Sequence, residues 1–297
     1  MQTDHRIRGH VAAAFTILVW STTYVSTKVL LQDFSPAEIL FFRFILAYLL
    51  LFLLSPRPLR PGSWREEMPF AAAGLCGVTL YFLFQNIGLT YTLASNAGLL
   101  VSVAALSTAD LAFITGSRGI LHRWFILGFF VSISGVFLIS FNGSFILELN
   151  PLGDLFILLG ALSWAFYSNI LALLSKSGYT LIQRTRKIFF YGILLMLPAL
   201  LLLDFKPDLS AFAQVENLAN MLFLGLGASA FCFLTWSYAV SAIGSVKSTT
   251  YLYFSPVITI VFSFIMLREP ITWASATGTV LIIAGLVLAE HKRGRRP

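Results

Sequence analysis

Residues 36–54 read PAEILFFRFILAYLLLFLL, an unbroken apolar run in which only Glu38 and Arg43 are charged. An α-helix needs about 20 predominantly apolar residues to cross the hydrocarbon core of a bilayer. The run is introduced by Ser35-Pro36-Ala37-Glu38, a capping box with proline at the first helical position. The stretch therefore predicts a membrane-spanning helix that begins at Pro36.

Similar apolar runs recur along the whole chain. The chain is 58% hydrophobic and 11% charged, with a mean hydropathy of +0.84, whereas a soluble domain carries about 25% charged residues. The short alternating segments of a transmembrane β-barrel do not occur. The first run is predicted to stay in the mature protein, because it lacks a small-residue cleavage site. These features predict an all-α integral membrane protein with ten spans, at residues 10–31, 36–54, 68–89, 94–116, 124–141, 152–174, 186–203, 218–240, 246–267 and 272–289.

Lysine and arginine are distributed unequally between the two sides of this arrangement. With the N-terminus inside, the outer side receives only Lys206 and Arg268, together with most of the acidic residues. Such an imbalance marks the cytoplasmic side. Both termini are therefore predicted to be cytoplasmic and the protein to lie in the cell (inner) membrane. The net charge of +7 then reflects orientation in the lipid bilayer, and we expect no nucleic-acid partner. The inner side receives Arg6, Arg8, Arg57, Arg60, Arg65, Arg118, Arg123, Lys176, Arg184, Arg186, Lys187, Lys247, Lys292, Arg293, Arg295 and Arg296.

The two halves of the chain resemble each other. When the second half is slid along the first, Trp164 falls on Trp20 and Lys187 falls on Arg43. Each half holds five spans, an odd number, so the second half must enter the membrane from the opposite side. Inverted repeats are typical of alternating-access transporters, whose substrate site lies near the midplane of the membrane. The predicted repeats are residues 9–141 and 153–290.

Several short motifs occur in order along the chain. They are Leu18-Val19-Trp20-Ser21, Leu93-Ala94-Ser95-Asn96-Ala97, Ser163-Trp164-Ala165, and the stretch from Tyr251 through Ser255-Pro256 to Arg268-Glu269-Pro270 and Gly278. Their order and spacing resemble the EamA branch of the drug/metabolite transporter superfamily over nearly the whole chain. The resemblance implies export of amino acids or related metabolites, without naming the substrate.

Trp20 and Trp164 lie near the middle of their spans, where an indole N–H finds no water. The two indoles either pack between helices, with their N–H groups bonded to neighbours, or line a substrate cavity. We favour the cavity, because polar side chains share the same helical stripes. Thr23 shares a stripe with Trp20, and Tyr167 and Ser168 share one with Trp164.

The third span carries Tyr81 and Gln85 near its middle, where polar groups are costly unless they are satisfied. Both are candidates for substrate binding. The repeat places Phe231, Thr235 and Tyr238 in the corresponding part of the eighth span. Further candidates in the fourth and ninth spans are Asn96, Ser102 and Tyr251.

Two charged residues lie deep in predicted spans. Arg43 is roughly 12 Å along its helix from the outer end, and an intramembrane charge is a functional hypothesis by default. Its alternatives are extension to the outer surface or pairing with an outer acid such as Glu269. Asp110 is the only acid that the predicted spans place deep in the membrane. It is a candidate carrier of a coupling proton or, alternatively, a partner of a cytoplasmic arginine.

These features favour a secondary transporter that exports small neutral or zwitterionic metabolites, such as amino acids, by alternating access. The alternatives are an organophosphate or drug antiporter of the same superfamily and a membrane-embedded enzyme. No catalytic or metal-binding motif occurs within the spans and no Walker A motif is present, so we expect no enzyme activity, cofactor, metal or ATP. Small residues in the fifth and tenth spans suit helix packing or a homodimer contact.

Overall fold

The computed structural model describes residues 2–56, 62–101, 104, 107, 108, 123–140, 151–203, 205–268 and 273–290, and every regular element within them is helical. The all-α class is confirmed. The first half contains α1 (Gln2–Leu30), α2 (Pro36–Leu54), α3 (Trp64–Gly74), η1 (Leu75–Leu80), α4 (Tyr81–Tyr91), α5 (Ala94–Leu100) and α7 (Arg123–Ser140). The second half contains α8 (Pro151–Leu174), α9 (Leu181–Leu202), η2 (Leu209–Ala213), α10 (Val215–Leu222), η3 (Phe223–Phe231), α11 (Cys232–Ile243), α12 (Ser245–Thr249), η4 (Thr250–Phe254), α13 (Ser255–Leu267) and α14 (Trp273–Glu290).

Six helical stretches of the described chain are long and apolar enough to cross a membrane, so the protein is a multi-pass membrane protein. Two shorter apolar helices, Ile126–Gly135 and Ala276–Gly285, lie within α7 and α14. The described residues do not reach the predicted number of ten spans by this count, and the ten-helix arrangement stays a prediction. The six stretches are Pro36–Leu54, Trp64–Tyr91, Leu152–Leu174, Leu181–Leu202, Val215–Ile243 and Ser245–Leu267.

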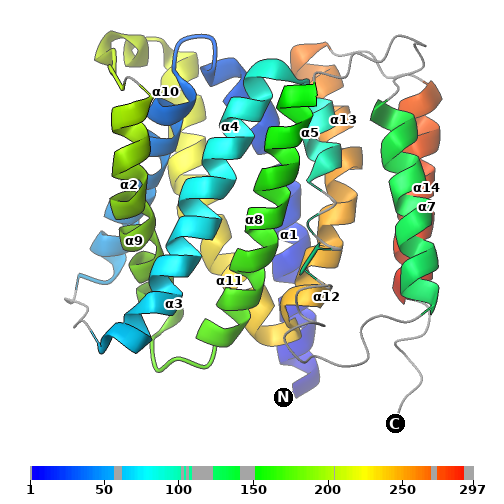
Figure 1. Ribbon diagram of the computed structural model, residues 1–297, viewed down its shortest axis with the longest axis horizontal. Helices are drawn as coiled ribbons and strands as arrows, with labels where there is room; N and C mark the ends of the chain where they lie inside the picture. The colour runs from blue at the N-terminus through cyan, green and yellow to red at the C-terminus, as the bar shows by residue number, and fades with distance from the viewer. Residues whose placement is uncertain are drawn as a thin grey trace.

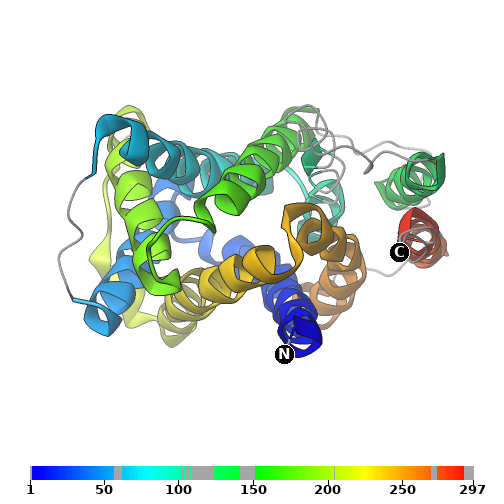
Figure 2. The same ribbon diagram turned by 90° about the horizontal axis from the view of Figure 1, so that it is seen from below.

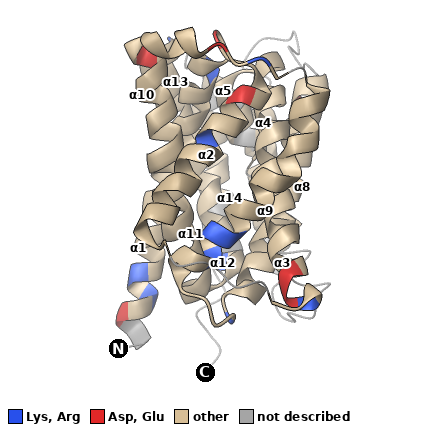
Figure 3. Cartoon of the chain, turned by 90° about the vertical axis from the view of Figure 1, so that its left-hand side faces the viewer, with Lys and Arg blue, Asp and Glu red and all other residues tan. Residues whose placement is uncertain are grey.

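The helices run alongside one another, with the start of α1 and the end of α14 at the same end of the bundle (Figure 1). Seen from that end, α7 and α14 stand together at one side of the other helices (Figure 2). Charged residues lie mainly toward the two ends of the bundle, and few lie midway along the helices (Figure 3). This distribution is the one expected when the middle of the bundle lies in hydrocarbon.

The two halves pack on each other rather than side by side as separate units. In the first half α1 packs on α11 and α13, and in the second half α8 packs on α4 and α5. Similarly, α2 packs on η3, and α9 packs on η1. A hydrophobic core drawn from both halves extends from Ile17 in α1 to Leu252 in η4. Each half therefore buries its apolar faces against the other.

Local sequence signals start several of these helices. The Ser35 hydroxyl accepts the Glu38 backbone N–H at 3.3 Å, and the Glu38 carboxylate accepts the Ser35 backbone N–H at 2.8 Å, which confirms the capping box. Helix α8 begins at Pro151, one residue before the predicted span at residues 152–174. Helix α9 begins at Leu181, earlier than the predicted residue 186, because Thr180 and Gln183 form a second capping box.

Two π-helical segments interrupt the long helices, and the sequence did not predict them. Leu75–Leu80 joins α3 to α4, and Phe223–Phe231 joins α10 to α11. They occupy corresponding places in the two halves when the chain is aligned with itself. A π segment adds a residue to the helical turn and changes the backbone hydrogen bonding, and such segments are frequent at functional sites.

Glycines allow the closest helix contacts. A Cβ atom at Gly74 in α3 would lie 2.6 Å from the backbone N of Gly192 in α9 and 2.7 Å from the Ile188 carbonyl oxygen. Between α7 and α14, a Cβ atom at Gly135 would lie 2.5 Å from the Gly278 carbonyl oxygen. The small faces of the fifth and tenth predicted spans therefore pack on each other, and a homodimer contact stays a prediction.

The Gly74 contact yields a stability prediction. Gly74→Ala is expected to destabilise the protein by about 1–3 kcal/mol, because the new methyl group meets backbone atoms that cannot rotate away. Gly178→Ala is the control, since a Cβ there meets nothing within 4 Å, and it should change stability by less than about 0.5 kcal/mol. Melting of the two purified variants in the same detergent measures the difference. Equal melting temperatures would contradict the close approach of α3 and α9.

Candidate functional site

A cluster of aromatic rings fills the interior between the two halves. The centroid of the Trp20 ring lies 5.1 Å from that of Trp164 and 5.2 Å from that of Trp236. The Trp164 ring lies 4.8 Å from the rings of both Tyr81 and Tyr167. The first and sixth predicted spans, which carry Trp20 and Trp164, thus meet in one place. The aromatic cluster consists of Trp20, Tyr81, Trp164, Tyr167, Phe233 and Trp236.

The three indole N–H groups of this cluster differ in their partners. The Trp20 Nε1 donates to the Ala228 carbonyl oxygen, in the π segment η3, at 2.7 Å. The Nε1 atoms of Trp164 and Trp236 are buried and have no hydrogen-bond partner among the described residues. A buried N–H without a partner loses its hydration without compensation. The cluster therefore presents two donors that a bound molecule can satisfy.

Arg43, on α2, lies next to this cluster and is fully buried. Its Nε donates to the Ser229 hydroxyl of η3 at 2.5 Å, and its guanidinium carbon lies 4.1 Å from the centroid of the Phe82 ring. The Phe82 ring is in turn 4.6 Å from that of Tyr81, a member of the aromatic cluster. The guanidinium thus does not extend to the surface, and it reaches across to the other half of the chain.

The remaining predicted site residues on the described chain fall into two groups. Gln85 and Ser168 are buried, with the Gln85 Nε2 and the Ser168 Oγ atoms unpartnered within the described part of the chain. Thr23 and Tyr251 are engaged: Thr23 donates to the Trp20 carbonyl oxygen at 2.6 Å, and the Tyr251 hydroxyl lies 2.8 Å from His10 Nδ1. Gln85 and Ser168 thus have buried polar atoms without partners among the described residues, whereas the hydroxyls of Thr23 and Tyr251 are hydrogen-bonded.

Three predicted residues are not placed. Asn96 belongs to α5, but its side chain lies outside the described part of the structure, as do Ser102 and Asp110 entirely. Their roles stay predictions.

Phe233 and Trp236, which are fully buried in the cluster, were not predicted as site residues. The repeat placed Phe231 in the corresponding part of the eighth span, yet Phe231 is 53% exposed. The π segments differ in length, with six residues in Leu75–Leu80 and nine in Phe223–Phe231, so equal repeat positions next to them do not face the same way. The available signal was the tryptophan itself, which lies near the inner end of the predicted eighth span at residues 218–240.

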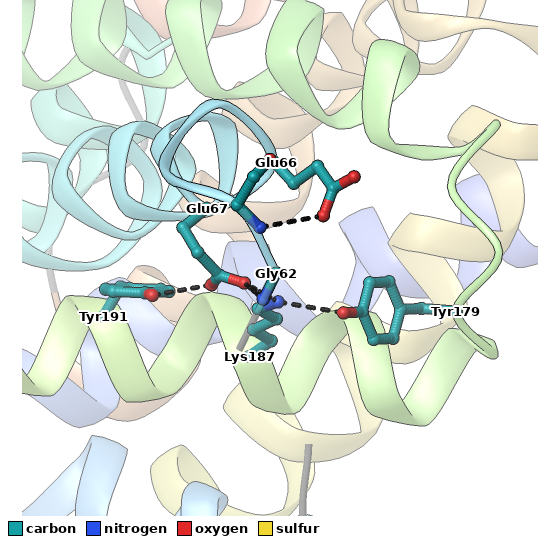
Figure 4. A network of polar contacts seen from close by, with 7 residues as sticks. Gly62, Glu66, Glu67, Tyr179, Lys187 and Tyr191 are labelled. Carbon is teal, nitrogen blue, oxygen red and sulfur yellow. Dashed lines mark hydrogen bonds and ion pairs between the residues drawn. The ribbon is translucent and has the colours of Figure 1, made fainter. Parts of the chain in front are cut away.

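A second polar group lies between α3 and α9, and Figure 4 shows its side chains converging. The Lys187 ammonium bonds to the Glu67 carboxylate at 2.6 Å and to the Tyr179 hydroxyl at 3.0 Å. The Tyr191 hydroxyl donates to the other Glu67 oxygen at 2.6 Å, and the Gly62 backbone N–H donates to the carboxylate at 2.5 Å. These contacts join the first half to the second near the end of the bundle where α1 begins.

The burial of this group was not predicted from the sequence. The side chain of Lys187, which was counted among the cations of the cytoplasmic side, is only 5% exposed. The side chain of Glu67, which lies just outside the predicted third span, is only 9% exposed.

Comparison with known proteins identifies the family. Residues 7–141 and residues 151–290 each match the profile of the EamA-like transporter family. The chain belongs to this family. The family model is that of transporters.

Individual relatives of this EamA-like transporter agree with the assignment. The chain is 28% identical over 290 residues to an uncharacterized transporter of Archaeoglobus fulgidus, with 96% of this chain and 98% of the relative covered. It is 27% identical over 291 residues to a probable terminal-alkyne amino-acid exporter of Streptantibioticus cattleyicolor, with 96% and 94% covered. A solved crystal structure superposes with a TM-score of 0.70 at 19% identity, covering 100% of both chains, which supports the fold alone.

The Lys187–Glu67 pair of this EamA-like transporter yields a second prediction. Lys187→Met should destabilise the protein by about 3–5 kcal/mol, because it leaves a buried carboxylate unpaired. Adding Glu67→Gln should recover part of that loss, since the uncompensated charge is removed. Melting of the single and double variants in one detergent measures the coupling.

The control is the Arg8–Asp4 pair, whose side chains are 70% and 63% exposed. Arg8→Met should cost less than about 1 kcal/mol, because exposed ion pairs contribute little. Additive effects in the Glu67 and Lys187 variants would contradict a buried, coupled pair.

Proposed function

We propose that this chain is a secondary transporter that exports small neutral or zwitterionic metabolites, such as amino acids, by alternating access. The observation that carries the proposal is the aromatic cluster with the buried, unpartnered N–H groups of Trp164 and Trp236. Family membership supports the transport part of the proposal, and the name of one relative, a probable amino-acid exporter, supports the substrate part.

The proposal includes a ten-helix arrangement of two inverted five-helix repeats, at residues 9–141 and 153–290. Reciprocal packing supports it, because α1 contacts α11 while α8 contacts α4. Reciprocal hydrogen bonds also support it. Trp20, of the first half, donates to the π segment of the second half at Ala228, while Ser163, of the second half, donates to the π segment of the first half at Cys76.

The chemistry of the cluster suits a compact organic molecule with both apolar and polar parts. Ring faces attract apolar side chains and ammonium groups, and the free indole N–H groups donate to carboxylate or carbonyl oxygens. Sliding or rocking of the two halves would expose the cluster to each side of the membrane in turn. Asp110, outside the described residues, is proposed to carry the coupling proton if transport is proton-driven.

The proposal predicts how Trp164 variants transport. In reconstituted vesicles, Trp164→Ala should lower counterflow of the best amino-acid substrate by about tenfold, because a ring that faces the substrate is lost. Trp164→Phe, which keeps a ring and most of the volume, should retain more activity. Trp64→Ala is the control, since Trp64 is 79% exposed at the start of α3. Normal transport by a folded Trp164→Ala variant would remove the aromatic cluster from the substrate path.

The proposed orientation, with both termini cytoplasmic in the inner membrane, predicts which loops can be labelled from outside. In a variant without Cys76 and Cys232, Ala213→Cys should react with a membrane-impermeant maleimide in intact cells. Gly178→Cys should react only after permeabilisation, because the α8–α9 loop is predicted to be cytoplasmic. Both positions are exposed in the structure. The opposite pattern of labelling would reverse the orientation.

A further inference from the structure

The Arg43 guanidinium is a buried positive charge with two unused donor nitrogens. Its side chain is 0% exposed, and its Nη1 and Nη2 atoms have no hydrogen-bond partner among the described residues. Among the described residues, its one polar contact is the bond from Nε to the Ser229 hydroxyl at 2.5 Å. Arginine stays charged in proteins, so a carboxylate or another anion is the partner that this group lacks.

The surroundings of the guanidinium are aromatic. The Phe82 ring lies 4.1 Å away and the Phe44 ring 5.7 Å away, measured from the guanidinium carbon to the ring centroids. The Tyr81 ring lies 4.6 Å from the Phe82 ring, measured between centroids. None of these groups neutralises a cation, although ring faces and phenol oxygens attract one.

Lys187 is the repeat mate of Arg43, and its positive charge has a carboxylate partner. Lys187 lies among the rings of Phe70 and Tyr179, at 4.5 Å and 4.6 Å from its Nζ atom. There the chain supplies its own carboxylate, from Glu67, at 2.6 Å. Corresponding positions in the two halves thus carry a cation among aromatic rings, and only the second-half position contains a carboxylate within the described residues.

We propose that Arg43 binds the carboxylate of the transported metabolite, an inference that rests on the proposed function and narrows its substrate class. The planar guanidinium fork matches a carboxylate in a bidentate arrangement. The rest of the substrate then lies toward Tyr81 and the aromatic cluster. In the state described here packed side chains enclose the fork, so the carboxylate reaches it when the halves rearrange. The site is selective for monocarboxylates, such as α-amino acids, over their amides and amines.

The experiment compares matched ligands on wild-type protein and on Arg43 variants. The ligands are a set of apolar amino acids, their carboxamides, and the amines that lack the carboxyl group. Binding is measured by the fluorescence of the tryptophans in detergent, and transport by counterflow in vesicles. The wild type should bind and move the amino acids at least about tenfold better than the amides and amines, since bonds between charged groups are lost in the latter.

Variants of Arg43 test whether this residue causes the preference for the free carboxylate. Arg43→Gln should abolish the preference for the free carboxylate, and Arg43→Lys, which keeps the charge without the fork, should retain part of it. Arg8→Gln, at an exposed position on α1, is the control and should behave as the wild type. Melting curves identify variants that fail to fold, and the comparison of Arg43→Lys with Arg43→Gln stays informative because the two differ chiefly in charge.

Three results overturn the inference, and they bear differently on the proposed function. A folded Arg43→Gln variant with wild-type selectivity would exclude Arg43 as the anchor while leaving amino-acid export intact. Equal transport of acids, amides and amines by the wild type would leave a transporter without a carboxylate site. If the wild type binds no carboxylate but transports another class of compound, both carboxylate binding by Arg43 and amino-acid export are excluded. Secondary transport would then still be supported.

Discussion

The interior of a bilayer contains no water, so every polar group placed there must find its partner within the protein. Helices satisfy this requirement for the backbone and force the chain into long apolar runs such as Pro36–Leu54. The two π segments depart from regular helix, and side chains of the opposite half use the carbonyls there: Trp20 bonds to Ala228, and Ser163 bonds to Cys76. The contact between the halves is thus made in part by side-chain hydrogen bonds to backbone carbonyls of the π segments.

Against this constraint, the polar groups that lack partners become informative. Among the described residues several of them lie on the helices that meet around the aromatic cluster, and they include Arg43, Gln85, Trp164 and Ser168. Other interior polar groups are bonded: the Arg184 guanidinium, for example, bonds to the hydroxyls of Ser237 and Ser241. The donors of Trp164, Trp236 and Arg43 lie in or next to the aromatic cluster without partners among the described residues, and they are the physical basis of the substrate site proposed there.

The two halves are alike in sequence but not in their contacts. Trp20 has a hydrogen-bond partner for its N–H, while the N–H of its repeat mate Trp164 has none within the described chain. Lys187 holds a carboxylate, while Arg43, its counterpart, holds only a hydroxyl. Such inequality between repeat mates is expected if one conformation of an alternating-access cycle is described, because the two halves then adopt different arrangements.

The sequence by itself determined the all-helical membrane class and the starts of α2 and α8, because the length of apolar runs and the capping residues are local features. It also singled out Trp20, Trp164 and Arg43 as site candidates, because a polar group in the middle of an apolar run is likewise a local feature. Only the tertiary structure decided that Phe233 and Trp236 complete the aromatic cluster and that Phe231 faces outward. A π segment changes the register of a helix without a local signal that a 3.6-residue repeat can detect. The tertiary structure also decided that Lys187 and Glu67 are buried together, because the pairing of residues far apart in the chain depends on how helices pack, and charge counting treats each residue alone.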